Sequence, residues 1–312
     1  MSKKVLVTGA AGFLGSNLCK RLVADGFDVT GVDNLYTGSL RNLEALQTYP
    51  QFNFVQHDII QPLNFTCDWL FNFACPASPP HYQKDPIFTA KTNFIGTLNM
   101  LELAHKNNAR IMQASTSEVY GNPLQHPQTE SYWGNVHTTG PRACYDEGKR
   151  VAESLFFDYK RMHNLDIKVI RIFNTYGPLM DPNDGRVISN FIMQALRGEP
   201  ITLYGTGEQT RSFCYVDDLI NGIMAMMHSD ASITGPINLG NPIEFTLKEL
   251  VETLSTVLGK PLPLITMPLP QDDPTRRQPD ITLAKQILHW QPQVDLATGL
   301  KHTIAYFRQF VS

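Results

Sequence analysis

The stretch VLVTGAAGFLG, residues 5–15, decides the fold of this chain. It runs from a short apolar segment through three glycines in the spacing G-x-x-G-x-x-G and directly into a helix-like segment. In a Rossmann fold, a glycine-rich turn between a strand and a helix holds the pyrophosphate of a dinucleotide. Small residues let the backbone approach the phosphates, and N–H groups at the helix N-terminus attract them. The stretch therefore predicts a dinucleotide site formed by Gly9, Gly12, Phe13, Leu14 and Gly15.

Asp33 favours this site over the alternative, a tight turn that binds no ligand. The glycine spacing departs from the general G-x-G-x-x-G, so the motif by itself leaves both interpretations open. Asp33 ends the second predicted strand about 20 residues further on, where a carboxylate accepts hydrogen bonds from the adenosine ribose. The same carboxylate would repel a 2′-phosphate, so we expect NAD rather than NADP. Asn34, Asp58 and Ile59 are expected beside the cofactor, with a solvated loop acid as the alternative for Asp58.

Strands and helices alternate along the first half of the chain. The predicted strands are Val5–Thr8, Phe27–Val32, Phe52–Gln56, Trp69–Phe73, Arg110–Ala114 and Ile167–Phe173, and the predicted helices are Phe13–Ala24, Asp85–Lys106 and Arg142–His163. In the second helix, Ile87, Ala90, Phe94, Leu98 and Leu101 form one apolar stripe. This alternation predicts an α/β fold, a Rossmann doubly wound parallel sheet with helices on both faces.

The composition of the sequence changes after Gly177. Proline and glycine become frequent, and Gly235–Pro242 and Pro261–Asp280 are predicted to be loops that frame a pocket. We therefore expect an NAD-binding Rossmann domain over residues 1–176 and a smaller C-terminal substrate-binding lobe over residues 177–312, with their segments interleaved.

Composition excludes several classes of function. The net charge is −3 and no basic block is present, which argues against a nucleic-acid partner. No apolar run approaches the roughly 18 residues of a membrane helix, and the chain opens directly into a strand rather than a signal peptide. The 5 cysteines lack CxxC spacing, and the 9 histidines show no paired spacing. We expect reduced thiols, a cytoplasmic location and no metal site.

A second motif, Tyr145-x-x-x-Lys149, carries chemistry. On a helix the two side chains lie on one face, and a nearby ammonium is expected to lower the pKa of the phenol from its usual value near 10. Such a pair also arises by chance. The stretch Ala114–Glu118 supports the catalytic interpretation, because it ends a parallel strand, where ligands bind in this fold. Its hydroxyls can bridge the tyrosine and a substrate oxygen.

Taken together, GAAGFLG, STSEVYG and YDEGK resemble the extended short-chain dehydrogenase/reductase family. The resemblance narrows to its group of UDP-glucuronate decarboxylases and runs nearly end to end. It is carried by VDNLYTG (32–38), ASPPHY (77–82), TNFIGTLNML (92–101), ASTSEVYG (114–121), GPRACYDEGKR (140–150), RIFNTYGP (171–178), NDGRVISNFI (183–192), QTRSFCYVDDL (209–219) and NLGNP (238–242).

The resemblance implies bound NAD, a UDP-sugar substrate and a reaction in three stages. Tyr145, assisted by Lys149 and Thr116, would accept the C4 hydroxyl proton while NAD⁺ takes the hydride. The C4 ketone makes the C5 carboxylate a β-keto acid, which loses CO₂. Protonation at C5 and return of the hydride would give UDP-xylose.

Ser117 and Glu118 separate this group from its relatives. The 4,6-dehydratases carry Asp-Glu at these positions, whereas typical 4-epimerases lack the carboxylate at the second one. Ser-Glu matches the decarboxylases. Glu118 is expected to position the ring or handle protons, and a strand-end acid that holds a loop is the alternative.

The resemblance also implies the substrate contacts. Arg277 would hold a water for protonation at C5, with the neighbouring Arg276 as the alternative candidate. For Arg211, which is expected at the diphosphate, a surface salt bridge is the alternative. The expected substrate residues are Tyr82 against the sugar, Arg142 and Arg277 near the glucuronate, Asn174 and Arg211 at the diphosphate, and Tyr204 near the uridine.

Other functions stay open at this point. One is a different NAD-dependent sugar-nucleotide enzyme: a 4-epimerase, a 4,6-dehydratase, or an oxidative decarboxylase that releases a 4-keto-pentose and NADH. Another is a catalytically silent NAD-sensing scaffold. Whichever applies, relatives imply a homodimer through a four-helix bundle made by the helices over residues 85–106 and 142–163.

Overall fold

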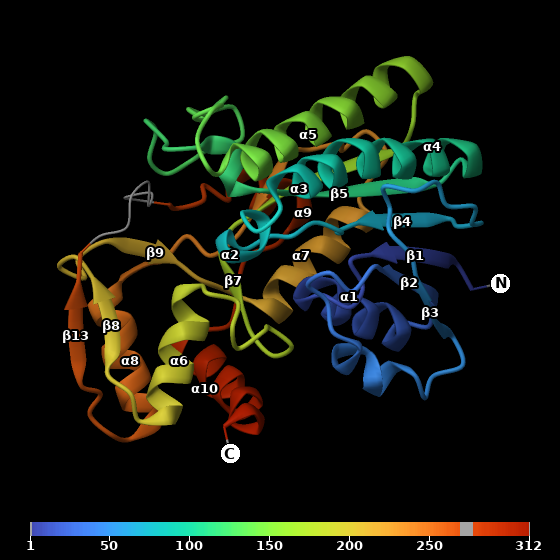
Figure 1. The fold of residues 1–312 in the computed structure, drawn as a ribbon. Coiled ribbons are helices and arrows are strands. Elements are labelled where there is room, and N and C mark those ends of the chain that lie inside the picture. Colours follow the sequence, from blue (N-terminus) through green and yellow to red (C-terminus); the bar gives the residue numbers. More distant parts are fainter. Residues whose placement is uncertain (1, 269–276, 312) are drawn as a thin grey trace.

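A seven-stranded parallel sheet forms the centre of the protein, as described by a computed structural model for residues 2–268 and 277–311 (Figure 1). Each strand pairs in parallel with its neighbour, and the β1–α1 turn lies at mid-sheet. The predicted doubly wound α/β fold is confirmed. In spatial order the strands are β11 (Ile237–Leu239), β6 (Ile167–Ile172), β5 (Arg110–Thr116), β4 (Trp69–Asn72), β1 (Lys4–Thr8), β2 (Asp28–Asp33) and β3 (Phe52–Gln56).

Helices cover both faces of this sheet. On one face α1 (Phe13–Ala24) packs against α7 (Val216–His228), and on the other α4 (Thr97–Asn107) packs against α5 (Ala143–His163) (Figure 1). Because both faces are buried, β1 is apolar without alternation. Its Val5 and Val7 join one hydrophobic core, whereas Leu6 joins the other.

The predicted helix over Asp85–Lys106 consists of three pieces. The first, α3 (Pro86–Lys91), is capped by Asp85, whose side chain accepts from the Phe88 N–H at 2.9 Å. A π-helical turn, η2 (Thr92–Gly96), then leads into α4. A π turn holds more residues than an α turn, so it rotates the following side chains around the helix axis.

The N-terminal part of the apolar stripe faces away from the protein, whereas its last residue, Leu101 of α4, is buried in the core. Ile87 is 68% exposed and Phe94 is 46% exposed. The buried side carries small and polar residues such as Asn93, which lies so close to α5 that a Cβ on Gly148 would come within 2.7 Å of its amide nitrogen. Hydrophobic periodicity therefore located the helix, while close packing against α5 selected its buried face.

Most of the second half of the chain builds a smaller lobe beside the sheet. Its strands are β8 (Ile201–Tyr204) with β13 (Leu264–Met267), β9 (Thr210–Ser212) with β12 (Glu244–Thr246), and β7 (Thr175–Tyr176) with β10 (Cys214–Tyr215). Its helices are α6 (Val187–Arg197), α8 (Leu247–Leu258) and α10 (Leu296–Phe307), whereas α9 (Thr282–Leu288) packs against β11 and α7 of the main sheet. Short helical turns complete the described chain: η1 (Leu40–Leu46), α2 (Pro79–Tyr82), η3 (Ser117–Tyr120) and η4 (Arg308–Phe310).

Two predicted loops contain strands. Gly235–Pro242 holds β11, which pairs with β6 at the edge of the main sheet, and Pro261–Asp280 holds β13. The short segment Ile237–Leu239, with glycine and proline on either side, looks like a loop along the sequence, because only pairing with the distant β6 makes it a strand. Within the described residues, no helix has both the length and the apolar composition of a membrane span.

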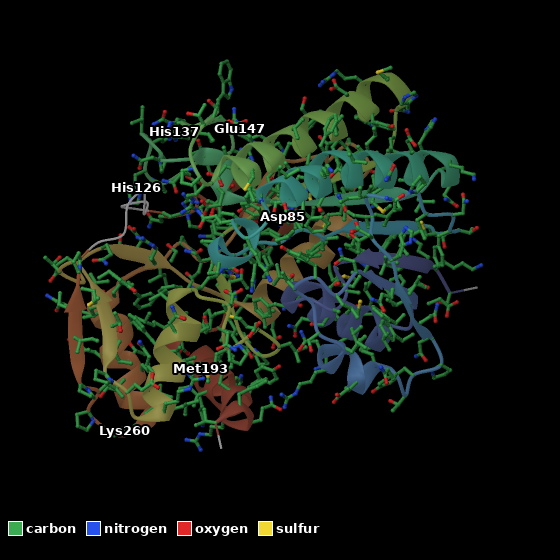
Figure 2. All side chains as sticks on the ribbon, viewed as in Figure 1. Asp85, His126, His137, Glu147, Met193 and Lys260 are labelled. Carbon is green, nitrogen blue, oxygen red and sulfur yellow. The ribbon has the colours of Figure 1, made fainter. Side chains whose placement is uncertain are left out.

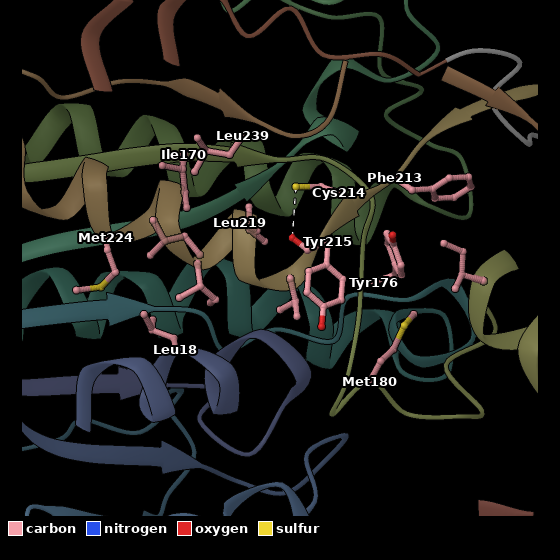
Figure 3. Close-up of a cluster of buried hydrophobic side chains, with 14 of the residues drawn as sticks. Leu18, Ile170, Tyr176, Met180, Phe213, Cys214, Tyr215, Leu219, Met224 and Leu239 are labelled. Carbon is pink, nitrogen blue, oxygen red and sulfur yellow. Dashed lines mark hydrogen bonds between the residues drawn. The ribbon is translucent and has the colours of Figure 1, made fainter. Parts of the chain in front are cut away.

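The core of the sheet continues into the second lobe. Figure 3 shows Leu18 of α1 and Leu219 of α7 in one cluster with Tyr176, Tyr215 and Met180 of the lobe. This shared packing fixes the lobe against the carboxyl ends of the strands.

Candidate active site

A cavity of about 860 Å³ lies at the carboxyl ends of the strands, the edge where this fold binds ligands. Every residue singled out from the sequence as a site residue lines it, although the residues come from distant elements. They are Gly9, Gly12, Phe13, Leu14, Gly15, Asp33, Asn34, Asp58, Ile59, Tyr82, Thr116, Ser117, Glu118, Arg142, Tyr145, Lys149, Asn174, Tyr204, Arg211 and Arg277. Arg276 lies outside the described residues.

The turn between β1 and α1 forms a cradle made of backbone. Gly9 has a φ of +69°, and a Cβ there would lie 2.9 Å from the backbone of Phe73 and Ala74. A Cβ on Gly15 would lie 2.0 Å from the Gly9 carbonyl oxygen. Within the described part of the chain, no side chain caps the N-terminus of α1. The N–H groups there suit a pyrophosphate, so the cradle fits a dinucleotide.

Acidic side chains mark the next part of the cavity. Asp33 ends β2 and accepts from the N–H groups of Ala11 at 3.0 Å and Leu35 at 2.7 Å. Burial raises its pKa, and these backbone hydrogen bonds act in the opposite direction. Asp58 accepts from the Asn34 amide at 3.0 Å, so it is tied to the neighbouring loop. A buried carboxylate at the end of β2 fits ribose hydroxyl donors, as NAD would present.

The Tyr145–Lys149 pair lies on the buried face of α5. The Lys149 ammonium is 5.8 Å from the centre of the Tyr145 ring and donates to the Ala114 carbonyl at 2.9 Å. The expected lowering of the tyrosine pKa is not found in the protein alone. Burial raises the pKa of Tyr145, against the opposing effects of Arg186 and a hydrogen bond with Thr116, and burial lowers the pKa of Lys149. Desolvation of the phenolate thus outweighs the nearby cations.

Tyr82 stacks on Tyr145. Their ring centres are 5.0 Å apart and their planes differ by 6°. Tyr82 is buried, and among the described residues its hydroxyl has no hydrogen-bond partner. The residue expected against the sugar therefore also covers one face of the Tyr145 ring.

Glu118 lies between two arginines. Arg142 donates to one carboxylate oxygen and Arg277 donates to the other. Burial acts to raise the pKa of Glu118, but these two guanidinium groups outweigh it and the pKa is lowered. The three predicted residues therefore form one ionic cluster, in which Arg277 is buried and Glu118 and Arg142 are partly exposed to the cavity.

The β5–η3 turn presents this cluster to the cavity. The Thr116 hydroxyl caps η3 by accepting from the Glu118 N–H at 3.2 Å. Arg277 also donates to the Ser117 hydroxyl at 3.2 Å and to the Gly121 carbonyl at 2.9 Å. The Thr116 and Ser117 hydroxyls thus lie beside the Glu118 carboxylate and its arginine partners, near the N-terminus of α5, the helix that carries Tyr145.

The lobe lines the remaining part of the cavity. Asn174 follows β6, and its carbonyl accepts from the Cys214 N–H at 2.9 Å. Arg211 lies on β9 and donates to the Thr210 carbonyl at 2.8 Å. Tyr204 ends β8 and is half exposed. Cationic and aromatic groups at this end suit a nucleoside diphosphate.

Three further residues near Tyr145 and Lys149 were not predicted from the sequence as site residues: Arg186, Asp146 and Cys75. Arg186, at the start of α6, donates to the Ala77 carbonyl at 2.7 Å, and its charge acts to lower the pKa of both Tyr145 and Glu118. Burial, with Glu118, raises the pKa of Asp146 to about 7. The Cys75 thiol lines the same cavity. Arg186 and Asp146 lie inside the motifs NDGRVISNFI and GPRACYDEGKR that carry the family resemblance, but nothing in the spacing of these two residues predicts a role in the site.

Known proteins resemble the chain closely. The sequence model of the NAD dependent epimerase/dehydratase family matches residues 5–240. UDP-glucuronic acid decarboxylase 1 of Xenopus tropicalis is 52% identical over 307 residues, covering 98% of this chain and 72% of the relative. UDP-glucuronic acid decarboxylase 6 of Arabidopsis thaliana is 53% identical over 298 residues, covering 95% and 86%. Among solved structures, UDP-glucuronic acid 4-epimerase from Bacillus cereus, in complex with UDP-glucuronic acid and NAD, has a TM-score of 0.88 at 28% identity, covering 98% of this chain and 99% of that one.

Proposed function

The chain belongs to the NAD dependent epimerase/dehydratase family and, within it, to the UDP-glucuronic acid decarboxylases, and we propose that its reaction runs through to UDP-xylose. It is an NAD-dependent enzyme that decarboxylates UDP-glucuronate. The observation that carries the proposal is the Glu118 cluster beside Tyr145, in the cavity that also contains the dinucleotide cradle.

Tyr145 handles the proton at C4. Bound NAD⁺ supplies the hydride acceptor for C4, and its positive charge favours the phenolate that burial in the protein alone disfavours. Tyr145 takes the hydroxyl proton and then, as a neutral phenol, donates a hydrogen bond to the new ketone. Thr116, which hydrogen-bonds Tyr145, joins it in holding the ketone oxygen.

Loss of CO₂ places negative charge on that same oxygen. The C5–carboxylate bond breaks, its electron pair forms the enolate, and CO₂ departs. Tyr145 and Thr116 stabilise the enolate because they are donors already aimed at the developing charge. Glu118 engages the guanidinium groups of Arg142 and Arg277. The arginines are thereby kept from binding the substrate carboxylate so tightly that its loss becomes slow.

Ser117 and Arg277 support completion of the reaction. The enolate needs a proton at C5, and the Ser117 hydroxyl with the Arg277 guanidinium can hold a water that delivers it. Ser117 itself is no acid for elimination of water, which disfavours a dehydratase. The nucleotide end of the substrate would lie along Asn174, Arg211 and Tyr204 in the lobe.

The test is incubation of the purified protein with UDP-glucuronate and catalytic NAD⁺, followed by mass spectrometry and by the NADH absorbance band. We expect one CO₂ and one UDP-pentose per substrate, without net NADH. A UDP-4-keto-pentose formed with stoichiometric NADH would instead identify an oxidative decarboxylase.

The proposal includes a homodimer. Ile87 and Phe94 are exposed on the helical segment that packs against α5, where Met162 is 75% exposed. Two helical segments from each copy would make a four-helix bundle and bury these apolar groups. Five free cysteines support a location in the cytoplasm, where thiols stay reduced.

A further inference from the structure

We propose that Gln128 is a positioning residue for the decarboxylation, because it holds residues 277–280 so that Arg277 stays on Glu118. The inference rests on the proposed function, which assigns Arg277 to the stages after C4 oxidation. Arg277 reaches the cavity from a segment that lies outside the main sheet, so something else must fix its position.

Gln128 forms an isolated parallel bridge with this segment, opposite Pro279. Its N–H donates to the Gln278 carbonyl at 2.9 Å, and its carbonyl accepts from the Asp280 N–H at 2.9 Å. The Gln128 side-chain oxygen accepts from the Gln278 N–H at 3.0 Å, and its side-chain nitrogen donates to the Gln125 carbonyl at 2.8 Å. The residue is 0% exposed, and all of its polar groups are paired.

Asn238 ties this bridge to the main sheet. It lies on β11, is fully buried, and donates from its amide to the carbonyls of Gln128 at 3.0 Å and Asp280 at 3.1 Å. Its side-chain oxygen accepts from the Tyr120 hydroxyl at 2.8 Å. The segment that carries Arg277 is therefore fastened to an edge strand of the Rossmann sheet.

The same network continues to the catalytic helix. Arg171 on β6 donates to the Tyr120 hydroxyl at 3.0 Å and forms a two-point ion pair with Glu153 at 2.9 and 2.7 Å. Glu153 lies one turn beyond Lys149 on α5 and accepts from the Ser115 hydroxyl at 2.5 Å. Buried networks whose members are all satisfied hold side chains rigidly. Arg277 and Tyr145 are thus positioned by one connected framework.

Mutation of Gln128 can remove the side-chain hydrogen bond of this bridge but not the backbone hydrogen bonds. The two backbone hydrogen bonds survive any substitution, but the side-chain acceptor for the Gln278 N–H does not. An unpaired N–H in this partly buried position is costly, so the segment is expected to shift until that group finds another partner. A displacement of about 1 Å at a catalytic group lowers rates by up to about 100-fold.

The first measurement is amide hydrogen exchange on the full-length protein. Gln128→Met keeps the side-chain volume and removes the acceptor, whereas Gln128→Glu keeps the acceptor oxygen. Over residues 277–281 we expect amide exchange in Gln128→Met to be faster than in the wild type. Exchange in Gln128→Glu should be slower than in Gln128→Met. Gln125→Met is the matched control, because the Gln125 amide donates to the Thr129 hydroxyl at 2.9 Å in the same segment. Unchanged exchange in Gln128→Met, or equal loss of protection in Gln125→Met, would overturn the proposal whatever the enzyme turns over.

The second measurement is a double-mutant cycle on kcat for UDP-glucuronate. We expect Gln128→Met to lower kcat about 10-fold, with the Kd for NAD unchanged, and to have no further effect in Arg277→Lys. Additive losses in the double variant contradict the positioning role. Asn238→Asp, which removes both amide donors but keeps the acceptor for Tyr120, should reproduce the non-additive loss if Gln128→Met does not fold. A wild type that makes no UDP-pentose refutes the proposed function instead, and hydrogen exchange still decides the role of Gln128.

Discussion

Glu118 and Arg277 form an ion pair across 159 residues of sequence, and the arginine is almost entirely buried by it. Arg142 binds the second oxygen of the same carboxylate. These ion pairs therefore join one carboxylate to two guanidinium groups, which leaves a net positive charge on the three side chains, and the Asp146 carboxylate lies 3.9 Å from Arg142. That balance suits a reaction in which the substrate must enter with a carboxylate and lose it.

Removal of the negative charge at Glu118 should unbalance this cluster. In Glu118→Gln, two arginines would bind the substrate carboxylate without competition, so we expect KM to fall and kcat to fall by about 100-fold or more. NAD binding, measured by calorimetry, should be unchanged. Glu147→Gln is the control, because Glu147 lies on α5 near the cluster, is partly exposed and pairs with Arg150 at 3.4 Å (Figure 2). Near-normal turnover in Glu118→Gln would remove Glu118 from the mechanism.

Tyr82→Phe should separate stability from substrate binding. The Tyr82 hydroxyl is buried and has no hydrogen-bond partner within the described ranges, so its removal should leave the free energy of unfolding unchanged or raise it by up to about 1 kcal/mol. The stacked ring on Tyr145 stays in place. Denaturant unfolding and KM for UDP-glucuronate are the readouts. A clear loss of stability would mean that the hydroxyl is satisfied in solution.

Asp146 should make stability depend on pH. Burial, together with Glu118, raises its pKa to about 7 in the folded protein, above the value of 3.8 for an unperturbed aspartate, while Arg142 and Arg277 oppose the shift. The folded state then binds the proton more tightly than the unfolded state, so this contribution is present below pH 4 and is lost as pH rises to 7. Asp146→Asn should remove that loss. At pH 8 we expect it to be more stable than wild type by about 1–3 kcal/mol, measured by urea unfolding. Parallel pH profiles would show that Asp146 is ionised throughout.

Asp33→Asn should change the choice of cofactor. The carboxylate that faces the ribose site becomes neutral, so repulsion of a 2′-phosphate is lost. We expect the Kd for NAD to rise about 10-fold and the Kd for NADP to fall, both by fluorescence titration. Asp28→Asn, at the exposed start of the same strand, is the control. NADP binding that stays as weak as in wild type would show that other groups set the preference.

Phe94→Asp should break the proposed dimer. A charge on the exposed stripe would have to be buried in the four-helix bundle, which is costly without a partner. Light scattering during size exclusion should then report a monomer of normal fold. Leu124→Asp changes an exposed apolar residue away from this stripe and should stay dimeric. A wild type that is already monomeric contradicts the dimer directly.

The local signals in the sequence predicted most of the fold, and long-range packing accounts for what they missed. The periodicity of 5–32 and the glycine spacing were enough for the β1–α1–β2 unit, because each depends on neighbouring residues. Strand β11 was missed, since its three residues become a strand only through β6. The exposure of Phe94 was also not predictable from the local sequence, because the close approach of α5 decides which face of its helix is buried.

The same division holds for the site. Residues at the ends of strands, such as Asp33 and Thr116, could be placed from the sequence because parallel strands end at one edge. Gln128 could not, because nothing near it in the chain indicates that residues 278 and 280 lie opposite. Arg186 was missed for the same reason: its charge is directed at Tyr145 by the packing of the lobe.

The edge strand β11 and the helix α7 come from the second half of the chain, yet both belong to the layers of the Rossmann sheet. A nascent chain that ends at residue 176 therefore carries a sheet in which β6 lacks its outer neighbour β11 and one face is covered by α1 without α7. Helix α7 is complete only at His228, and β11 only at Leu239. During synthesis the dinucleotide-binding half cannot complete its fold until these residues have left the ribosome. Chaperones are therefore expected to bind the nascent chain while its length lies between 176 and 239 residues.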